Sequence, residues 1–453
     1  MTKLNQYILF VFVTLEVLLY NRFFAVQAAV SIIEYLFILF VLARDFKKGT
    51  LYFIAFSLLA MGKWSYVITE EIPFNFWGLR FFNFSVNIFL SLFIFLRLIL
   101  KYKKNIDFDF VNRNRLIFIY LVFTFVIGLF STLFGINYHD DFISDVFVSI
   151  PIITSFYLIS IYSHKELQNL AVLCIKLTTY SMLLSYLFNI EFEYSEGEYF
   201  VLMNSFAFIV PFSIFFFRKY LKKEEYIIQV CVIAFLFITG KIFLSGKLMI
   251  IIVLLILWLI YINRKSTIAI AVATSLFLIT PVIIEGVTNY VNSNVVLQWK
   301  FKQIESGLSN YNNLMLTEGS LGNLFAEGYL IQDHFKQNKR YFVMGKGLGA
   351  GIPDKFQLLS VTAGAGGYKI EDLNRNNYHI MHLSLLDLAL KGGYLWGALF
   401  IFFVCRFFFM GNIFSFVTFI LLFMVYYTSK EMILITVLFY RLSIFNNSTR
   451  KLI

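Results

Sequence analysis

Alternating glycines beside a lysine are the first residues of this sequence that could do chemistry. Gly345, Gly347 and Gly349 stand on alternate positions after an apolar pair, and Lys346 lies between the first two. Glycines at this spacing allow tight turns and a close approach of the backbone to a ligand. Exposed amides with a cation beside them favour phosphate oxygens. The pattern therefore predicts a loop that binds an anionic group, and the simpler interpretation is a turn that leaves a helix.

Two histidines follow, at the point where a polar stretch gives way to an apolar one. His379 and His382 precede a leucine-rich amphipathic turn, after which Gly392 and Gly393 open a second apolar run. An imidazole titrates near neutral pH, so it can act as a general base or, when protonated, as a cation. If the segment is helical, residues three apart lie on one face. This spacing predicts His379 as a partner of His382, and a solvated loop histidine is the alternative.

Isolated basic side chains in or near apolar runs form a third group of candidates. Lys247, Lys241 and Arg80 fall toward the outer ends of such runs, while Arg340 and Arg375 lie in the polar stretch. A charge inside hydrocarbon is costly, so it usually faces a cavity or a partner. We expect these five side chains to contact an anionic substrate. A lysine that reaches the membrane interface would give the same pattern as Lys247.

An acidic triplet, His139-Asp140-Asp141, lies in a short loop between two apolar runs. Acidic pairs in a loop of this kind can serve as a base or as metal ligands. Acidic residues also accumulate in loops that do not face the cytoplasm, because basic residues concentrate in the cytoplasmic ones. We give the second interpretation more weight.

The elements that must position these residues are apolar. Of 453 residues, 59% are hydrophobic and 14% charged, with 5 prolines, whereas globular proteins average roughly 45–50% apolar and 25% charged residues. The sequence therefore predicts an all-α polytopic membrane protein. Its three cysteines stand far apart inside apolar runs, with no His or Cys at metal spacing. We expect buried thiols, no metal and no cofactor.

Apolar runs of about 20 residues, the length that crosses the hydrocarbon, divide the chain into three parts. Residues 1–284 are predicted to form N-terminal transmembrane helices, 285–381 one large outward-facing loop, and 382–453 C-terminal transmembrane helices. We expect about 12–14 transmembrane helices in all. The candidate runs are 4–20, 24–43, 51–69, 76–100, 116–135, 142–162, 167–190, 200–217, 226–244, 248–262, 266–284, 382–406, 413–427 and 432–445.

The loops between these runs alternate in charge. Basic residues gather in one set, as at 44–48, 101–115 and 218–223, and the other set is acidic or neutral, as at 139–141 and 191–198. The basic loops are predicted to be cytoplasmic, which places both termini of a multi-pass membrane protein in the cytoplasm. In a bacterium this membrane would be the inner (cytoplasmic) membrane. The net charge of +11 follows from this pattern, and we expect no nucleic-acid partner.

The order of these features resembles the O-antigen polymerase and O-antigen ligase superfamily of polytopic membrane glycosyltransferases. In that family a large outer loop ends in Gly-x-Gly-x-Gly and is followed by a histidine, a leucine-rich segment and a pair of spaced glycines. The sequence has Gly345-x-Gly347-x-Gly349, then His382, then Gly393-x-x-x-Gly397. The family also often carries a serine or threonine closely followed by a basic residue in an outer turn, where Lys247 stands here.

Two positions depart from the family pattern. Leu383 follows the histidine where the family usually has asparagine, and Asn323 stands where the loop commonly has arginine. If a basic residue is needed there, Lys300, Lys302 or Arg340 would have to supply it.

The resemblance implies an enzyme that transfers a glycan from undecaprenyl diphosphate to a hydroxyl of a second lipid-linked oligosaccharide. Lys247, with Arg340 or Arg375, would neutralise the charge that develops on the diphosphate, and His382 would act as base or cation. No metal is required. Polymerisation of repeat units into O-antigen, capsular or exopolysaccharide is the reaction we favour over ligase-like transfer, with a chain-length regulator and a flippase as partners.

Two other classes of membrane protein stay open. A flippase or transporter for lipid-linked oligosaccharides would also have a basic, aromatic cavity, but it needs no large outer loop and usually shows two similar halves. A structural or receptor-like membrane subunit would explain the loop, though not the order of its glycines and histidine.

Overall fold

The computed structural model describes residues 3–19, 24–60, 79–81, 84–195, 198–201, 220–239, 320–356, 358–359, 370–379, 381, 384–410, 412–424 and 430–450. The helices are α1 (Lys3–Leu18), α2 (Phe24–Arg44), α3 (Phe46–Leu59), α4 (Val86–Lys101), η1 (Lys103–Asn105), α5 (Phe108–Arg113), α6 (Arg115–Leu133), α7 (His139–Ser160), α8 (His164–Leu187), α10 (Lys223–Ile238), α14 (Ser320–Gln337), α15 (Lys339–Met344), α17 (Ile370–Arg375), α18 (Ser384–Gly392), α19 (Tyr394–Phe409), α20 (Ile413–Met424) and α21 (Lys430–Arg450). The strands are β1 (Arg80–Phe81), β2 (Phe84–Ser85), β3 (Glu191–Ser195), β4 (Glu198–Val201), β5 (Ile352–Pro353) and β6 (Asn377–Tyr378).

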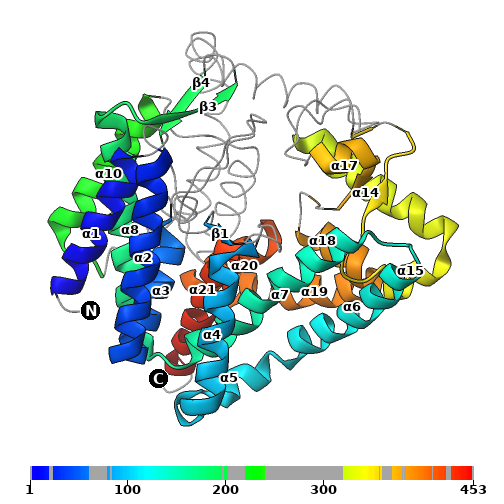
Figure 1. The fold of residues 1–453 in the computed structure, drawn as a ribbon, viewed down its shortest axis with the longest axis horizontal. Coiled ribbons are helices and arrows are strands. Elements are labelled where there is room, and N and C mark those ends of the chain that lie inside the picture. The colour runs from blue at the N-terminus through cyan, green and yellow to red at the C-terminus, as the bar shows by residue number, and fades with distance from the viewer. Residues whose placement is uncertain are drawn as a thin grey trace, which may run out of the picture.

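The described chain is mostly helical, as the composition predicts. Its strands form three two-stranded antiparallel hairpins, β1 with β2, β3 with β4, and β5 with β6. Figure 1 shows α1, α2, α3, α8 and α10 at one side of the molecule, α4, α7, α20 and α21 in the middle, and α14, α15 and α17 at the other side.

Three of the described helices, α6, α7 and α8, are long and apolar enough to cross a membrane. Only 28% of the residues in the most apolar stretch of α6 are buried inside the protein. Side chains such as Leu116, Val122 and Phe130 are exposed. An apolar surface this large would be unstable in water, and a bilayer covers such a surface. The helix is therefore suited to a lipid environment.

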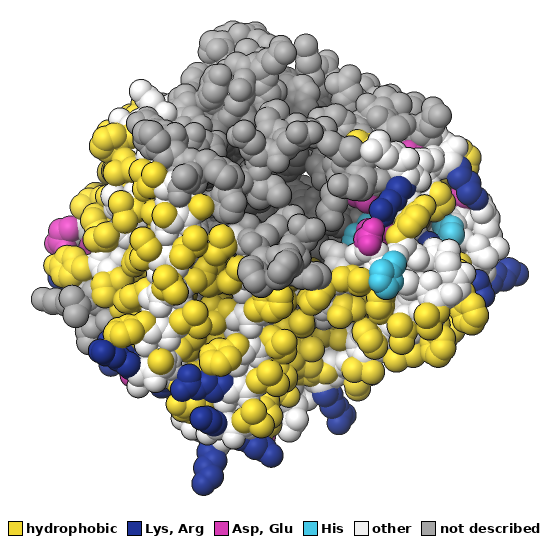
Figure 2. All heavy atoms as spheres, in the orientation of Figure 1, with side chains coloured by type: hydrophobic (Ala, Val, Ile, Leu, Met, Phe, Trp, Pro, Cys, Tyr) yellow, Lys and Arg dark blue, Asp and Glu magenta, His cyan; other side chains and the backbone are white. Residues whose placement is uncertain are grey.

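The surface of the molecule supports the same conclusion. Figure 2 shows a broad apolar surface over the lower half of the view, with lysine and arginine side chains along its lower edge. Cys231 of α10 is exposed and Cys405 of α19 partly so, whereas Cys174 is buried. The prediction of three buried thiols is therefore wrong for Cys231, because an apolar run can face lipid as well as protein.

Local signals in the sequence fix several helix starts. Ser163 and Glu166 form a capping box at the start of α8, where each side chain satisfies a backbone amide of the first turn. Asp107 caps α5 through a bond from the amide of Phe110. The Asp107 carboxylate also accepts a hydrogen bond from Arg441 of α21 (2.5 Å), which ties a loop to the C-terminal helix.

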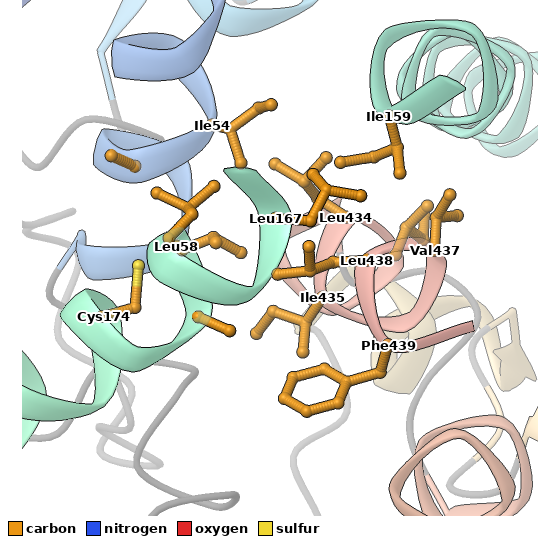
Figure 3. Close-up of a cluster of buried hydrophobic side chains, with 14 of the residues drawn as sticks. Ile54, Leu58, Ile159, Leu167, Cys174, Leu434, Ile435, Val437, Leu438 and Phe439 are labelled. Atoms are coloured by element: carbon orange, nitrogen blue, oxygen red, sulfur yellow. The ribbon is translucent and has the colours of Figure 1, made fainter. Parts of the chain in front are cut away.

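The main core is built around α21, which packs against α3, α7, α8 and α20. Figure 3 shows Leu434, Ile435, Val437, Leu438 and Phe439 of α21 beside Ile54 and Leu58 of α3, Ile159 of α7, and Leu167 and Cys174 of α8. Where lipid surrounds the helices, close packing of such side chains rather than their removal from water holds the helices together. The first and last parts of the chain therefore share one core.

The polar segment has a core of its own. Ala326, Ile331 and Phe335 of α14 pack with Tyr378 of β6 and Leu390 of α18. The helical spacing in this segment predicts a helix over 329–342, and the structure has two, α14 and α15, which meet at Asn338. Leu390 joins this second core to the apolar helices.

Most predicted apolar runs in the described chain are helices, with three corrections. The run 76–100 begins with the β1–β2 hairpin, and its helix starts only at Val86. The run 51–69 starts earlier, at Phe46, where Asp45 caps α3. The run 382–406 is two helices, α18 and α19, separated at Gly393, whose φ is +85°. The runs 248–262 and 266–284 and nearly all of 200–217 lie outside the described residues.

Candidate functional site

The glycine stretch lies against the apolar helices. Gly345, Gly347 and Gly349 have φ values of +65°, +78° and +77°, a region that glycine adopts at no steric cost. A Cβ on Gly347 would lie 2.0 Å from the amide nitrogen of Gly128 in α6, and one on Gly349 would lie 2.6 Å from the amide nitrogen of Phe142 in α7. The alternate glycines are therefore needed for close packing of the loop on α6 and α7.

Four successive amides of this loop donate hydrogen bonds inside the protein. The pairs are Lys346 N to Leu390 O (2.9 Å), Gly347 N to Lys391 O (2.8 Å), Leu348 N to Thr124 O (2.9 Å) and Gly349 N to Asp145 Oδ2 (2.6 Å). Because these amides are already used, they do not offer the predicted cradle for a phosphate in this structure. The loop instead joins α6, α7 and α18.

Lys346 closes the loop rather than facing an anion. Its Nζ donates to the carbonyl oxygen of Gly351 at 2.5 Å, and the residue is 4% exposed. Burial lowers the pKa of Lys346 to about 8, because the charged ammonium is poorly solvated there. Asn137 holds the same loop by donating to the carbonyl oxygens of Lys346 (2.9 Å) and Leu348 (3.1 Å).

A buried ion-pair cluster lies directly beneath this loop. Lys391 of α18 is fully buried, and its Nζ lies 2.9 Å from Oδ2 of Asp387 and 3.1 Å from Oδ1 of Asp145 in α7. Isolated charges at such depth would be very unfavourable, so both carboxylates are needed as partners of the ammonium. One carboxylate oxygen of Asp145 thus accepts a hydrogen bond from Nζ of Lys391, and the other accepts one from the amide of Gly349.

His379 extends the cluster toward the polar segment. Its Nε2 lies 3.2 Å from Oδ2 of Asp145, and its Nδ1 lies 3.7 Å from Oδ1 of Asp141. Neither ring nitrogen makes a well-aligned hydrogen bond within the described part of the chain. His379 is 1% exposed, so it cannot reach a soluble substrate in this conformation. In this conformation His379 faces Asp145 and Asp141, and its catalytic role stays a prediction.

Arg375 forms the outer end of the cluster. It is the last residue of α17, and its guanidinium lies 3.3 Å from Asp140, 4.0 Å from Asp141 and 4.8 Å from the centre of the Tyr138 ring. One third of the side chain is exposed. Arg375 is thus a cluster cation that reaches the surface.

The cluster has a simple charge balance. If both carboxylates are ionised, Asp145 and Asp387 bring two negative charges against the one positive charge of Lys391, all at 4% exposure or less. A protonated His379 would bring this buried group to neutrality. At the surface, Arg375 pairs with both Asp140 and Asp141. Among the described ion pairs, the other partner of these two carboxylates is His379, which faces Asp141. An anionic ligand could bind here only if it displaced Asp140 and Asp141 from Arg375, or if it brought a cation of its own to these carboxylates.

Of the other predicted site residues, Arg340 has a described side chain, and its described contacts are with Tyr341 rather than with the cluster. Arg340 of α15 donates to the hydroxyl of its neighbour Tyr341 (3.0 Å) and is exposed. Arg80 lies in β1, and its side chain is outside the description. Lys241, Lys247 and His382 lie outside the described residues.

The helical segment on which the expected pairing of the two histidines depends is not present at His379. Tyr378 pairs with Ile352 in the β5–β6 hairpin, His379 and Met381 are not helical, and α18 begins only at Ser384. The hairpin and the ion pairs of His379 instead fix the backbone three residues before His382.

Three central residues of the cluster were not predicted from the sequence. Asp145, Asp387 and Lys391 each stand in a run that is otherwise apolar, and Asp387 and Lys391 are spaced by one helical turn. Charges in apolar runs are the signal that could have found them. The acidic triplet at 139–141, which the sequence analysis gave less weight, supplies two of the carboxylates at the outer end.

Comparison with known proteins places no further constraint on this site. No family model, no curated protein and no solved structure matches the chain. Within the described ranges, no three His, Cys, Asp or Glu side chains are arranged to hold a metal ion.

Proposed function

We propose that this protein is a polytopic membrane glycosyltransferase that polymerises undecaprenyl-diphosphate-linked oligosaccharide repeat units. The observation that carries the proposal is the docking of the polar segment, through its glycines and His379, onto a charged cluster at the ends of apolar helices. A site of this kind can meet a substrate whose lipid is in the bilayer and whose sugars are in water.

The chemistry needs a base and a counterion for the leaving group. The acceptor hydroxyl attacks the anomeric carbon of the donor glycan, the bond from that carbon to the diphosphate oxygen breaks, and the hydroxyl proton passes to a base. In the proposal His382 takes this proton. Lys247 and Arg375 stabilise the negative charge on the departing lipid diphosphate.

The described cluster has a supporting role in this scheme. Asp145 holds the glycine loop through Gly349, holds α18 through Lys391 and faces His379. These contacts fix the two chain segments that precede and follow His382. Catalytic groups must stay within a fraction of an ångström of the productive geometry, so a rigid charged scaffold beside them is useful.

The first experiment is a deletion of the protein in its own bacterium. Loss of a polymerase should leave single lipid-linked repeat units at the outer surface of the membrane, and complementation should restore long chains. Repeat units trapped on the cytoplasmic side would instead favour a flippase. Long chains that remain on undecaprenyl diphosphate would favour ligase-like transfer.

Point variants test the assigned roles in the same complementation assay. His382→Ala should abolish chain extension at normal protein abundance, because no other base is proposed. Lys247→Ala should impair extension more than Lys247→Arg does, because the proposed need is for charge. Equal effects of the two lysine variants would indicate that Lys247 only anchors its helix at the interface.

A further inference from the structure

A second feature of the structure is an apolar slot among the helices that carry the buried cluster. It lies between α6, α7, α18, α19, α20 and α21 and has a volume of about 210 Å³. Side chains along its length include Ile117, Ile152, Phe156, Phe403 and Val437. An apolar cavity of roughly 150 Å³ is already large enough to bind benzene and stays free of water. The slot can therefore hold hydrocarbon.

The two ends of the slot differ in character. Tyr120 and Trp396 lie at one end, with ring centres 5.3 Å apart, and Arg113 and Arg406 lie at the other. Trp396 and Arg406 are separated along α19 by nearly three turns, about 15 Å at 1.5 Å per residue. The slot is thus a narrow apolar channel with cations at one end only.

The arginines at this end are accessible. Arg113 and Arg406 are both exposed, and Arg406 uses one nitrogen to reach the hydroxyl of Tyr440 at 3.3 Å. A guanidinium has five N–H donors, so others stay available. A shallow polar hollow shares Arg113 with the slot and adds Arg115, with Asp109 at its edge. Charge and shape together fit a molecule that has a phosphate at one end and a hydrocarbon chain behind it.

The slot opens beside a surface that is suited to lipid. Leu116 lines the slot and is exposed at 57%, and Leu399, which also lines it, is exposed at 48%. The basic loop 101–115 that supplies Arg113 is also the loop that the charge pattern assigns to the cytoplasmic side. Anionic phospholipids give that leaflet its negative surface potential.

We propose that this slot binds one acyl chain of an anionic phospholipid of the bilayer, with its phosphate held by Arg113 and Arg406. The inner end of the chain would lie against Leu388, which lines the slot from α18 between Asp387 and Lys391. The bound lipid then packs against α18, the helix that carries Asp387 and Lys391 of the buried cluster. This inference depends on the membrane setting and not on glycosyl transfer.

Native mass spectrometry of the detergent-purified full chain tests the proposal. After delipidation, phosphatidylglycerol, phosphatidylcholine and undecaprenyl phosphate are added back separately. One phosphatidylglycerol should bind on the order of tenfold more tightly than phosphatidylcholine, because its headgroup has a net negative charge, whereas the choline ammonium neutralises the phosphate of phosphatidylcholine beside the two arginines. The Arg113→Gln/Arg406→Gln variant should lose this preference. Arg44→Gln, which removes an exposed arginine that stacks on Phe40 of α2, should keep it.

Filling the slot tests the position of the acyl chain. Ile152→Phe and, separately, Leu399→Trp should each weaken phosphatidylglycerol binding about tenfold or more, since the added ring occupies space needed by the chain. Leu36→Phe, on an exposed face of α2, should have no effect. The second filling variant is at an exposed position, so it tolerates a larger side chain if Ile152→Phe does not fold.

Three results would overturn the inference. Equal binding of phosphatidylcholine would remove the role of the arginines. Tighter binding of undecaprenyl phosphate would make the slot a carrier site rather than a phospholipid site. Unchanged phosphatidylglycerol binding in both the Arg113→Gln/Arg406→Gln and Leu399→Trp variants would place the lipid elsewhere. None of these results depends on whether the protein extends glycans.

Discussion

At the scale of single residues, Asp145 joins three segments that are distant in the sequence. It accepts from Gly349 of the loop, pairs with Lys391 of α18 and lies next to His379. Breaking a buried ion pair by removing one partner is far more costly than replacing the pair with apolar residues. The cluster therefore makes a distinct prediction about paired and single substitutions.

Lys391→Met should destabilise the protein by about 3–5 kcal/mol, because it leaves the carboxylates of Asp145 and Asp387 buried without their ammonium. The double variant Asp387→Leu/Lys391→Met should recover part of this loss, since one unpaired carboxylate is also removed. Unfolding of the detergent-solubilised protein measures both. A double variant less stable than Lys391→Met would show that Asp387 does not depend on Lys391 for its charge balance.

Because the ammonium of Lys346 is buried, we predict that the stability of the protein depends on pH. Burial lowers the pKa of its ammonium to about 8 in the folded protein from 10.5 in the unfolded chain. Between these two values the unfolded chain binds more protons, so stability rises with pH in this window and is insensitive to this group below it. From about pH 7.5 to about pH 9.5 the gain attributable to Lys346 should be about 2 kcal/mol.

Comparison with Lys346→Met isolates this contribution from other groups that titrate in the same range. The variant loses the hydrogen bond to Gly351 at every pH, which shifts its stability by a constant amount. Its stability should then rise less between the two pH values than that of the natural protein. Identical pH profiles would mean that the ammonium is not desolvated as described.

The sequence allowed the glycine loop, His379 and Arg375 to be chosen, because glycine spacing and isolated polar residues are visible along the chain. It did not show that Asp145 and Lys391 meet, since they are far apart in sequence and only packing brings them within 3.1 Å. The phosphate cradle was inferred from glycines whose amides turn out to bond to Leu390, Lys391, Thr124 and Asp145. Alternate glycines alone do not distinguish close helix contact from ligand contact.

At the scale of elements, the loop and α6 approach each other through two glycines. A Cβ on Gly128 would lie 2.5 Å from backbone atoms of Leu348, and one on Gly347 would lie 2.0 Å from the backbone of Gly128. Backbone atoms cannot move aside as a flexible side chain can. The contact between loop and helix therefore depends on the absence of both side chains.

Gly347→Ala should be strongly destabilising, and Gly135→Ala is its matched control. Both glycines have positive φ, +78° and +70°, but a Cβ on Gly135 has nothing within 4 Å. Gly135→Ala should cost only the left-handed conformation, about 1–2 kcal/mol. Gly347→Ala should cost clearly more in the same unfolding assay, and equal costs would contradict the close approach of the loop to α6.

Helix ends were predicted least well. The runs of α6, α7 and α8 were found within a few residues because each is long and apolar. The run over 382–406 was expected to be one helix, although Gly392 and Gly393 were visible in it. The break at Gly393 and the packing of Asp387 and Lys391 against Asp145 show that this run contains a separate short helix, α18, which carries two buried charges.

At the scale of the whole molecule, the mostly helical fold was predicted from composition and the core was not. Apolar content and period are enough to indicate helices, but they do not tell which faces meet protein and which meet lipid. The central place of α21 among α3, α7 and α8 depends on long-range packing. The orientation of the chain in a membrane stays a prediction from the charges of its loops.

Cysteine labelling tests that orientation. In a background with the three native cysteines replaced by serine, Lys103→Cys and Lys355→Cys both place a thiol at an exposed position. A membrane-impermeant maleimide that reaches the outer face of the inner membrane should label Lys355→Cys alone, because 101–115 is predicted to be cytoplasmic. After the membrane is permeabilised both should react. Labelling of both before permeabilisation would contradict the topology.

The account as a whole is tested most directly by incubating the purified protein in liposomes with an undecaprenyl-diphosphate-linked repeat unit and measuring glycan length. We predict chains of several repeat units, with Lys355→Gln close to the natural protein. Arg375→Gln should be slower on the order of a hundredfold, the effect of losing one stabilising cation or donor. Repeat units that stay single in the presence of folded, correctly inserted protein would contradict the proposed polymerase.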